Sequence, residues 1–142
     1  MEFWVKALMA GNVLAYRLTG GLLGSKMAGQ SVLLLNTVGR KSGKMYTTPM
    51  NYYRDGDDYL VVASNWGKEH NPAWYYNLMH QSTTIIQVNR KRIQVRAHEA
   101  TGPEYDRLWQ MVTQKNDFYI RYHEQTDRHI PIVLLSPMPA TT

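Results

Sequence analysis

Apolar residues follow a helical spacing at the start of the chain. Between residues 3 and 18 they recur at multiples of four, as Trp4, Leu8 and Tyr16 do, which is typical of an amphipathic helix. Several glycines follow shortly afterwards. We therefore expect residues 1–24 to form an N-terminal helix and linker. Such a helix docks on its own domain or, alternatively, lies on a membrane surface or a partner subunit.

After residue 30 the pattern changes to short runs that are rich in β-branched, aromatic and other apolar residues. Asp55-Gly56 separates two of these runs and Asn89-Arg90-Lys91 separates two others, which predicts two β-hairpins. Pro131 lies near the start of the last run, where a strand tolerates proline. The expected strands cover residues 32–36, 44–53, 59–63, 83–88, 93–97 and 130–135.

Helices are expected between and after the hairpins. Asn71-Pro72 predicts a helix that runs to about residue 80, with Asn71 as the N-cap and Pro72 at the first helical position. A second helix is expected over residues 101–112, with Thr101 as its cap, and a third, short one over residues 116–124.

Strands joined mostly as hairpins, with helices inserted, indicate a mainly β fold. We expect an antiparallel six-stranded barrel with added helices. A parallel α/β sheet would require helices to alternate with the strands. With 142 residues, 44% of them apolar, the chain is expected to form a single domain over residues 1–142, with its barrel core at residues 30–136.

Composition narrows the function classes. The chain has no cysteine, which excludes disulfides, thiolate metal sites and a cysteine nucleophile. Its histidines lack the spacing of metal ligands and there is no G-x-S-x-G motif, so neither a metal site nor a serine hydrolase is expected. No apolar run is long enough to span a membrane and the N-terminus lacks a basic signal-peptide region, so we expect a cytoplasmic protein.

Candidate chemistry is densest in the loop Gly39-Arg40-Lys41-Ser42-Gly43-Lys44, between two expected strands. Glycines allow exposed amides to cradle an oxyanion, and Arg40 and Lys41 add positive charge. A net charge of +5 likewise favours an anionic partner, such as a phosphate-bearing cofactor, although solubility alone also explains it. The loop is not a Walker motif, because a strand rather than a helix follows it. An ordinary basic hairpin turn is the alternative.

A second candidate cluster lies where an expected strand ends at residue 63. Ser64 and Asn65 offer hydrogen bonds there, and Trp66 offers a stacking face. Strand ends that lead into loops commonly contact ligands. The alternative is an ordinary turn with one exposed aromatic residue.

Two of the expected helices carry further candidates. Trp74 and Leu78 are four residues apart and, in the simpler interpretation, face the core. Tyr119 and Tyr122 share one helical face, so their phenols could line a substrate pocket close to His123.

In order and spacing, these segments resemble the deazaflavin-dependent nitroreductases. The matching segments are LNTVGRKSG at 35–43, RDG at 54–56, AS at 63–64, NPAWY at 71–75 and TDRHIPIV at 126–133. The resemblance covers roughly residues 30–135. It implies a split β-barrel related to the flavin-mononucleotide-binding oxidoreductases. It also implies an enzyme that binds coenzyme F420 and transfers hydride from the reduced deazaflavin to a quinone, enone or nitroaromatic acceptor.

The resemblance further implies roles for individual residues. The cofactor's phosphate and acidic tail are expected at Gly39, Arg40, Lys41 and Ser42. The ring and the rest of the cofactor are expected at Pro49, Met50, Ala63, Ser64, Asn65, Asn71, Trp74 and Asn77. Ser64, Tyr119 and Tyr122 are the expected catalytic residues, because their hydroxyls could polarise the acceptor.

Other functions remain open at this stage. In the same fold, a chain of this kind could bind flavin mononucleotide (FMN), flavin adenine dinucleotide (FAD) or haem, or hold a cofactor or lipid without catalysis. Arg90, Lys91 and Arg92 suggest nucleic-acid binding, but basic residues at a hairpin tip more simply keep a strand edge soluble, so no nucleic acid is expected. The expected partner is a small-molecule electron acceptor, with membrane contact through the N-terminal helix as an alternative, for a monomer or a homodimer.

Overall fold

The computed structural model describes residues 26–27, 30–126 and 128–139, and the expected N-terminal helix lies outside them. Eight strands and four helical segments make up the described part of the chain. The strands are β1 (Lys26–Met27), β2 (Gln30–Val38), β3 (Met45–Asn51), β4 (Tyr53–Asp55), β5 (Asp58–Val62), β6 (Thr83–Val88), β7 (Lys91–Glu99) and β8 (Ile132–Pro137). The helices are η1 (Asn65–Gly67), a 3₁₀ turn, and the α-helices α2 (Ala73–His80), α3 (Gly102–Lys115) and α4 (Phe118–Gln125).

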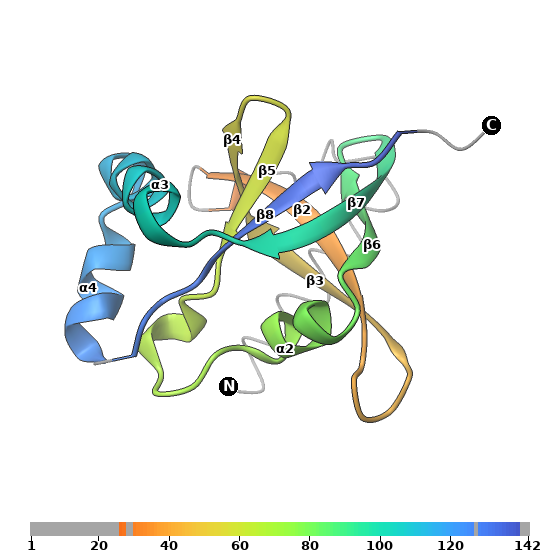
Figure 1. Cartoon of the computed structure of the whole chain (residues 1–142), viewed down its shortest axis with the longest axis horizontal. Coiled ribbons are helices and arrows are strands. Elements are labelled where there is room, and N and C mark those ends of the chain that lie inside the picture. The colour runs from red at the N-terminus through yellow and green to blue at the C-terminus, as the bar shows by residue number, and fades with distance from the viewer. Residues whose placement is uncertain (1–25, 28–29, 127, 140–142) are drawn as a thin grey trace.

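The strands form one curled antiparallel sheet (Figure 1). Its order is β1-β2-β6-β7-β8-β5-β4, and β3 pairs with β2. All of these pairs are antiparallel. β3 and β5 contact each other without forming a ladder, so the sheet stays open between them. The mainly β, antiparallel architecture with added helices is confirmed.

The expected count of six strands is wrong, for two local reasons. The segment expected as one strand over residues 44–53 is divided at Tyr52, because the chain pairs with β2 up to Asn51 and with β5 from Tyr53 onward. This divides the segment into β3 and β4. β1 contains only two residues, which is too short to produce a recognisable alternation. Both expected hairpins are present, as β4–β5 and β6–β7.

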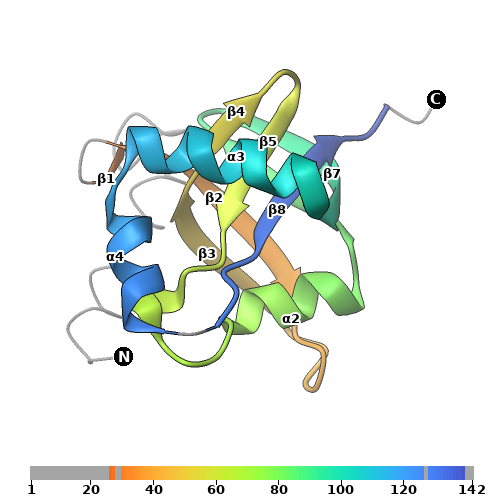
Figure 2. The ribbon, with the colours of Figure 1, turned by 60° about the vertical axis from the view of Figure 1, so that its left-hand side comes forward.

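Side chains alternate between two apolar layers on either side of the sheet. In β5, Tyr59 and Val61 face the interior core, whereas Leu60 faces the opposite layer. The interior core is closed by α2 through the fully buried Leu78. Residues of α3 and α4 cover the outer layer, and α3 crosses this face of the sheet in Figure 2. Burial of both faces stabilises the sheet at about 25 cal/mol per Å² of apolar area.

The helices begin close to the expected positions, but the N-cap of α2 differs from the expected one. Pro72 occupies the N-cap position of α2, so the expected Asn71 cap is wrong. The side-chain oxygen of Asn71 instead accepts a hydrogen bond from Arg128. Thr101 is the N-cap residue of α3 as expected, although its side chain makes no capping hydrogen bond. Among the described helices, none is both long and apolar enough to cross a membrane.

Candidate active site

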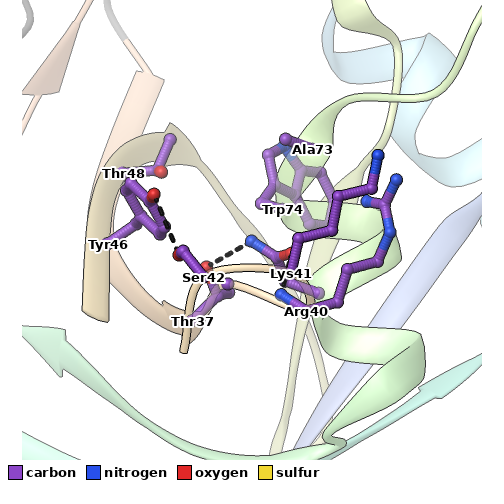
Figure 3. Close-up of a pocket in the computed structure, with 10 residues that line it drawn as sticks. Thr37, Arg40, Lys41, Ser42, Tyr46, Thr48, Ala73 and Trp74 are labelled. Carbon is purple, nitrogen blue, oxygen red and sulfur yellow. Dashed lines mark hydrogen bonds between the residues drawn. The ribbon is translucent and has the colours of Figure 1, made fainter. Parts of the chain in front are cut away.

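A pocket of about 400 Å³ lies between the β2–β3 hairpin and α2 (Figure 3). In this view Tyr46 and Thr48 of β3 lie on one side, Arg40 and Lys41 of the loop on the other, and Trp74 of α2 between them. The residues that line the pocket are Thr37, Gly39, Arg40, Lys41, Ser42, Tyr46, Thr48, Ala73, Trp74 and Asn77. The pocket thus brings together six of the residues expected at the cofactor: Gly39, Arg40, Lys41, Ser42, Trp74 and Asn77.

The loop between β2 and β3 is closed by its own backbone. The amide of Gly39 donates to the carbonyl of Lys44 over 2.7 Å, and the amide of Gly43 donates to the carbonyl of Gly39 over 2.8 Å. A Cβ atom on Gly39 would lie 2.6 Å from Ser42 Oγ and 2.8 Å from Cε2 of Tyr46. The loop therefore requires glycine at its first position, because two pocket side chains approach its backbone closely.

Helix α2 fixes the loop through Asn77. This side chain is only 6% exposed, and its Oδ1 accepts a hydrogen bond of 3.1 Å from the amide of Arg40. Its Nδ2 donates to Thr37 Oγ1 over 3.3 Å. One residue earlier in α2, the ring of Tyr76 lies beneath the Arg40 guanidinium, with 4.8 Å between the guanidinium carbon and the ring centroid. Arg40 is thus held at both its backbone and its side chain.

The loop presents several donors that are not used within the described part of the chain. Neither Arg40 nor Lys41 has a carboxylate partner among the described residues, and both side chains are exposed. The backbone amides of Lys41 and Ser42 likewise donate to no group in that part of the structure. Ser42 Oγ and the hydroxyl of Tyr46 lie 3.3 Å apart beside them. This arrangement suits a phosphate or carboxylate group.

The other end of the pocket is apolar. Trp74 lines the pocket and also packs, half-buried, against the interior core. Met50, also expected at the cofactor, packs against the same core from β3 and is not among the residues that line the pocket. The expected core-facing role of Trp74 and Leu78 is therefore confirmed, and Trp74 additionally exposes part of its surface to the pocket. An aromatic face beside a cationic loop suits a ligand that combines a flat ring with an anionic part.

Sequence reasoning missed four lining residues: Ala73 of α2, and Thr37, Tyr46 and Thr48 of the hairpin. The register pairs Thr37 with Tyr46 and Leu35 with Thr48 across the hairpin. Since Tyr46 and Thr48 are two residues apart, they share a face of β3. Treating residues 35–48 as one hairpin around the basic loop would have placed these side chains beside it.

Several other expected site residues lie outside the pocket lining. Pro49 is buried and pairs with Leu34, so it belongs to the face of β3 opposite Met50. Ala63, the residue directly after β5, is fully buried. Ser64 and Asn65 follow it and are partly exposed, and Asn65 Nδ2 donates to the carbonyl of His70 over 2.8 Å. Asn71 is engaged by Arg128 rather than facing the pocket.

The two candidate catalytic tyrosines of α4 lie in the outer apolar layer. Tyr119 is 6% exposed, and the hydroxyl of Tyr53 donates to the Tyr119 hydroxyl over 3.1 Å. Burial and the neighbouring Tyr53 raise the pKa of Tyr119 far above its usual range. Tyr122 is only partly buried and its ring packs edge-on against that of Tyr119, with 6.4 Å between centroids. The structure does not bring either phenol to the pocket lining.

No group of three or more His, Cys, Asp or Glu side chains that could hold a metal ion occurs among the described residues.

Comparison with known proteins assigns the chain to a family. The sequence model described as F420H(2)-dependent quinone reductase matches residues 8–137, which is most of the chain. The chain belongs to the F420H(2)-dependent quinone reductase family. This is an oxidoreductase family that uses coenzyme F420, so the recognition of a deazaflavin-dependent reductase from the sequence is confirmed.

Individual relatives agree with the family assignment. The chain is 42% identical over 125 residues to an F420H(2)-dependent quinone reductase of Mycobacterium tuberculosis, covering 85% of this chain and 84% of that protein. A solved F420-H2 dependent reductase superimposes with a TM-score of 0.67 at 30% identity, covering 74% of this chain and 93% of the other. A second solved structure, described as a domain-swapped dimer, has a TM-score of 0.72 at 28% identity and covers 94% and 97% of the two chains.

Proposed function

We propose that this chain binds coenzyme F420 between the β2–β3 loop and α2 and reduces a quinone. The proposal rests on the pocket between the β2–β3 loop and α2, found in a chain that belongs to this family. Two cations without carboxylate partners in the described structure, Arg40 and Lys41, stand there beside the partly exposed ring of Trp74. The acceptor class follows the names of the family and of the 42% identical relative.

The chemistry of the pocket fits the cofactor. Coenzyme F420 carries a phosphate and several glutamates at one end and a flat deazaflavin ring at the other. Arg40, Lys41 and the amides of residues 41–42 would hold the anionic end. Trp74 and Met50 would provide apolar contact for the ring. When bound, the reduced cofactor supplies a hydride, so the protein mainly has to bind and orient the two reactants.

The residues around the reacting groups are assigned by their positions after β5 and on α4. Ser64 lies two residues after the end of β5, and we assign its hydroxyl to hydrogen-bonding the acceptor oxygen. Tyr122 is partly exposed, and we assign it to the same task from α4. Tyr119 is buried behind Tyr122, so its role is to support that ring rather than to contact the acceptor. Such donors accelerate reaction when they bind the transition state more tightly than the ground state.

Oxidation of reduced coenzyme F420 by different acceptors tests this proposal. The wild-type protein is mixed with reduced cofactor and with menadione, a nitroaromatic compound or a cyclic enone in separate assays. We expect the highest kcat/KM with the quinone. Equal or faster turnover of the nitroaromatic compound would contradict the acceptor assignment. Absence of turnover with all three, in a protein that binds the cofactor, would favour a non-enzymatic cofactor carrier.

A further inference from the structure

We propose that Arg128 is a positioning residue that holds the segment 63–71 in place for the reaction. This segment leads from β5 to α2 and carries Ser64, so the inference rests on the proposed function. Arg128 lies 57 residues after Asn71 and 64 residues after Ser64 in the sequence, so its guanidinium group joins distant parts of the chain. No role in binding or catalysis was expected for Arg128 from the sequence.

The contacts of the guanidinium group follow the segment along its length. Nη2 donates to the carbonyl of Ser64 over 2.8 Å, and Nη1 donates to the carbonyl of Ala63 over 3.1 Å. Nε donates to the carbonyl of Lys68 over 3.1 Å. These three acceptors span the whole of η1, so one side chain fixes both ends of that turn.

The same group also fixes the start of α2. Nη1 donates to the side-chain oxygen of Asn71, two residues before the helix begins. Because α2 carries Trp74 and Asn77 into the pocket, Arg128 connects the expected reacting end of the site with the helix that holds the cofactor loop. This explains why Asn71 does not cap the helix.

Helix α4 supports the segment from the other side. Gly67 has a φ of +77°, and a Cβ atom there would lie 2.7 Å from Gln125 Oε1 and 3.3 Å from Cα of Tyr122. The turn therefore packs directly against the backbone of α4, as Figure 2 shows at the C-terminal end of that helix. The turn that follows Ser64 is thereby packed against Tyr122, and the Arg128 guanidinium group holds Ser64 in the same arrangement.

Only arginine can make this set of contacts. Its planar guanidinium offers five N–H donors in a fixed fork, whereas lysine offers one compact ammonium group. Its partners on the segment are neutral oxygens, namely three backbone carbonyls and the side-chain oxygen of Asn71. A lysine would satisfy one or two of them and leave the others without a donor. The cofactor loop at residues 39–44 has no contact with Arg128 among these hydrogen bonds.

The test compares Arg128→Ala and Arg128→Lys with Arg121→Ala, a matched loss of one positive charge. Arg121 is exposed on α4, where its ion pair with Asp117 spans 3.4 Å. The first readout needs no activity and measures the rate of tryptic cleavage after the exposed Lys68 in native conditions. Both Arg128 variants are expected to be cleaved about tenfold faster than wild type or Arg121→Ala, because local opening of the segment costs less.

The second readout separates positioning from general loss of structure. For Arg128→Ala we expect kcat/KM with menadione to fall about tenfold or more, mainly through kcat, while the Kd for coenzyme F420 changes less than about threefold. Arg128→Lys is not expected to restore kcat. If Arg128→Ala does not fold, Asn71→Ala removes one partner only and should give a smaller change in the same direction.

Three results would overturn the inference. The first is a rate of tryptic cleavage after Lys68 that equals the wild-type rate in folded Arg128 variants. The second is a wild-type kcat in Arg128→Ala, and the third is a wild-type kcat in Arg128→Lys when Arg128→Ala is slow. Failure of the proposed function is distinguishable, because it would appear as an inactive wild-type protein whose Arg128 variants still show accelerated cleavage.

Discussion

At the scale of single residues, the two cations of the pocket differ in how firmly they are held. Arg40 is fixed through its amide by Asn77 and through its guanidinium by the Tyr76 ring. The Lys41 side chain is exposed and has no ion pair within the described residues. A fixed cation loses less conformational entropy when it binds an anion. Arg40 should therefore contribute more to cofactor affinity than Lys41.

Replacing either cation should weaken binding of coenzyme F420. We expect each of Arg40→Ala and Lys41→Ala to cost about 1.5 to 3 kcal/mol, roughly a tenfold loss of affinity or more, with the larger loss for Arg40. Raising the salt concentration should reduce the difference from wild type, because charge attraction is screened. Titration monitored by cofactor fluorescence measures this. Arg92→Ala, an exposed arginine on β7, is the matched control, and unchanged affinity in the Arg40 variant would remove the loop from the site.

Three hydroxyl deletions should separate chemical from structural roles. Ser64→Ala and Tyr122→Phe are each expected to lower kcat and kcat/KM together by about tenfold or more, if their hydroxyls bind the transition state. Tyr119→Phe should leave the rate nearly unchanged. It should lower the free energy of unfolding by about 1 kcal/mol, since Tyr53 loses its acceptor. Single-turnover oxidation of reduced cofactor and urea unfolding provide the two measurements. A large rate loss in Tyr119→Phe would instead place that phenol at the acceptor.

What could be predicted at this scale depended on sequence distance. The basic loop was recognisable because Gly39, Arg40 and Lys41 are adjacent and their chemistry is local. The contact between Asn71 and Arg128 joins residues 57 positions apart, and no local pattern indicates it. Tyr119 illustrates a local pattern that was recognised but whose environment was not. Its spacing from Tyr122 correctly gave a shared helical face, but spacing cannot say whether that face meets a ligand or the sheet.

At the scale of elements, α2 connects the pocket to the sheet. The hydroxyl of Tyr75 donates to the Glu99 carboxylate at the end of β7. Together with Leu78, this contact holds the helix that carries Trp74 and Asn77. A change in the attachment of α2 should therefore alter the positions of the pocket residues that this helix carries.

The attachment of α2 should weaken in alkaline solution. Burial is the main cause that raises the pKa of Tyr75 to about 12, and the hydrogen bond to Glu99 is the second. The unfolded value is about 10, and a raised pKa favours the protonated, folded form. The stabilisation is thus complete below about pH 10 and is lost as the pH rises toward 12. Urea unfolding at pH 9 and pH 11 should show this loss in the wild type and a smaller loss in Tyr75→Phe. An equal loss in both proteins would contradict the assignment.

The β2–β3 loop should not tolerate a side chain at its first glycine. In Gly39→Ala, the new methyl group would displace Ser42 or the Tyr46 ring, both of which line the pocket. We expect weaker binding of coenzyme F420 by about tenfold, with the fold preserved. Gly56→Ala is a suitable control. It lies in the β4–β5 turn at a φ of +60°, where a Cβ would meet nothing within 4 Å, so only strain is introduced. Equal affinities of wild type and Gly39→Ala would show that the close approach is unimportant for binding.

Strand prediction succeeded where one face alternated or a run was clearly apolar, as in β5 and β6. It was less successful for the segment 44–53, because the break at Tyr52 comes from a change of pairing partner, from β2 to β5, rather than from any turn-forming residue. β2 appeared as a continuous apolar run because Leu33 and Leu34, on opposite faces, are both buried. The outer layer formed by α3 and α4 required tertiary packing that periodicity alone does not supply.

At the scale of the whole molecule, charge is distributed unevenly between two hairpins. The β2–β3 loop carries Arg40, Lys41 and Lys44, whereas the β4–β5 hairpin carries Asp55, Asp57 and Asp58. The two hairpins lie at opposite ends of the molecule in Figures 1 and 2. With a net charge of +5, the molecule should attract an anionic cofactor and orient it toward the loop.

The central claim is that this fold binds coenzyme F420 through the β2–β3 loop. Direct titration of the wild-type protein with coenzyme F420 and with FMN, at low and at high salt, tests it most directly. We predict that coenzyme F420 binds at least about tenfold more tightly than FMN at low salt, and that this preference shrinks as salt screens the loop's charges. In the Arg40→Ala/Lys41→Ala double variant the preference should largely disappear. Equal or tighter binding of FMN by the wild type, or an undiminished preference in the double variant, would contradict the account.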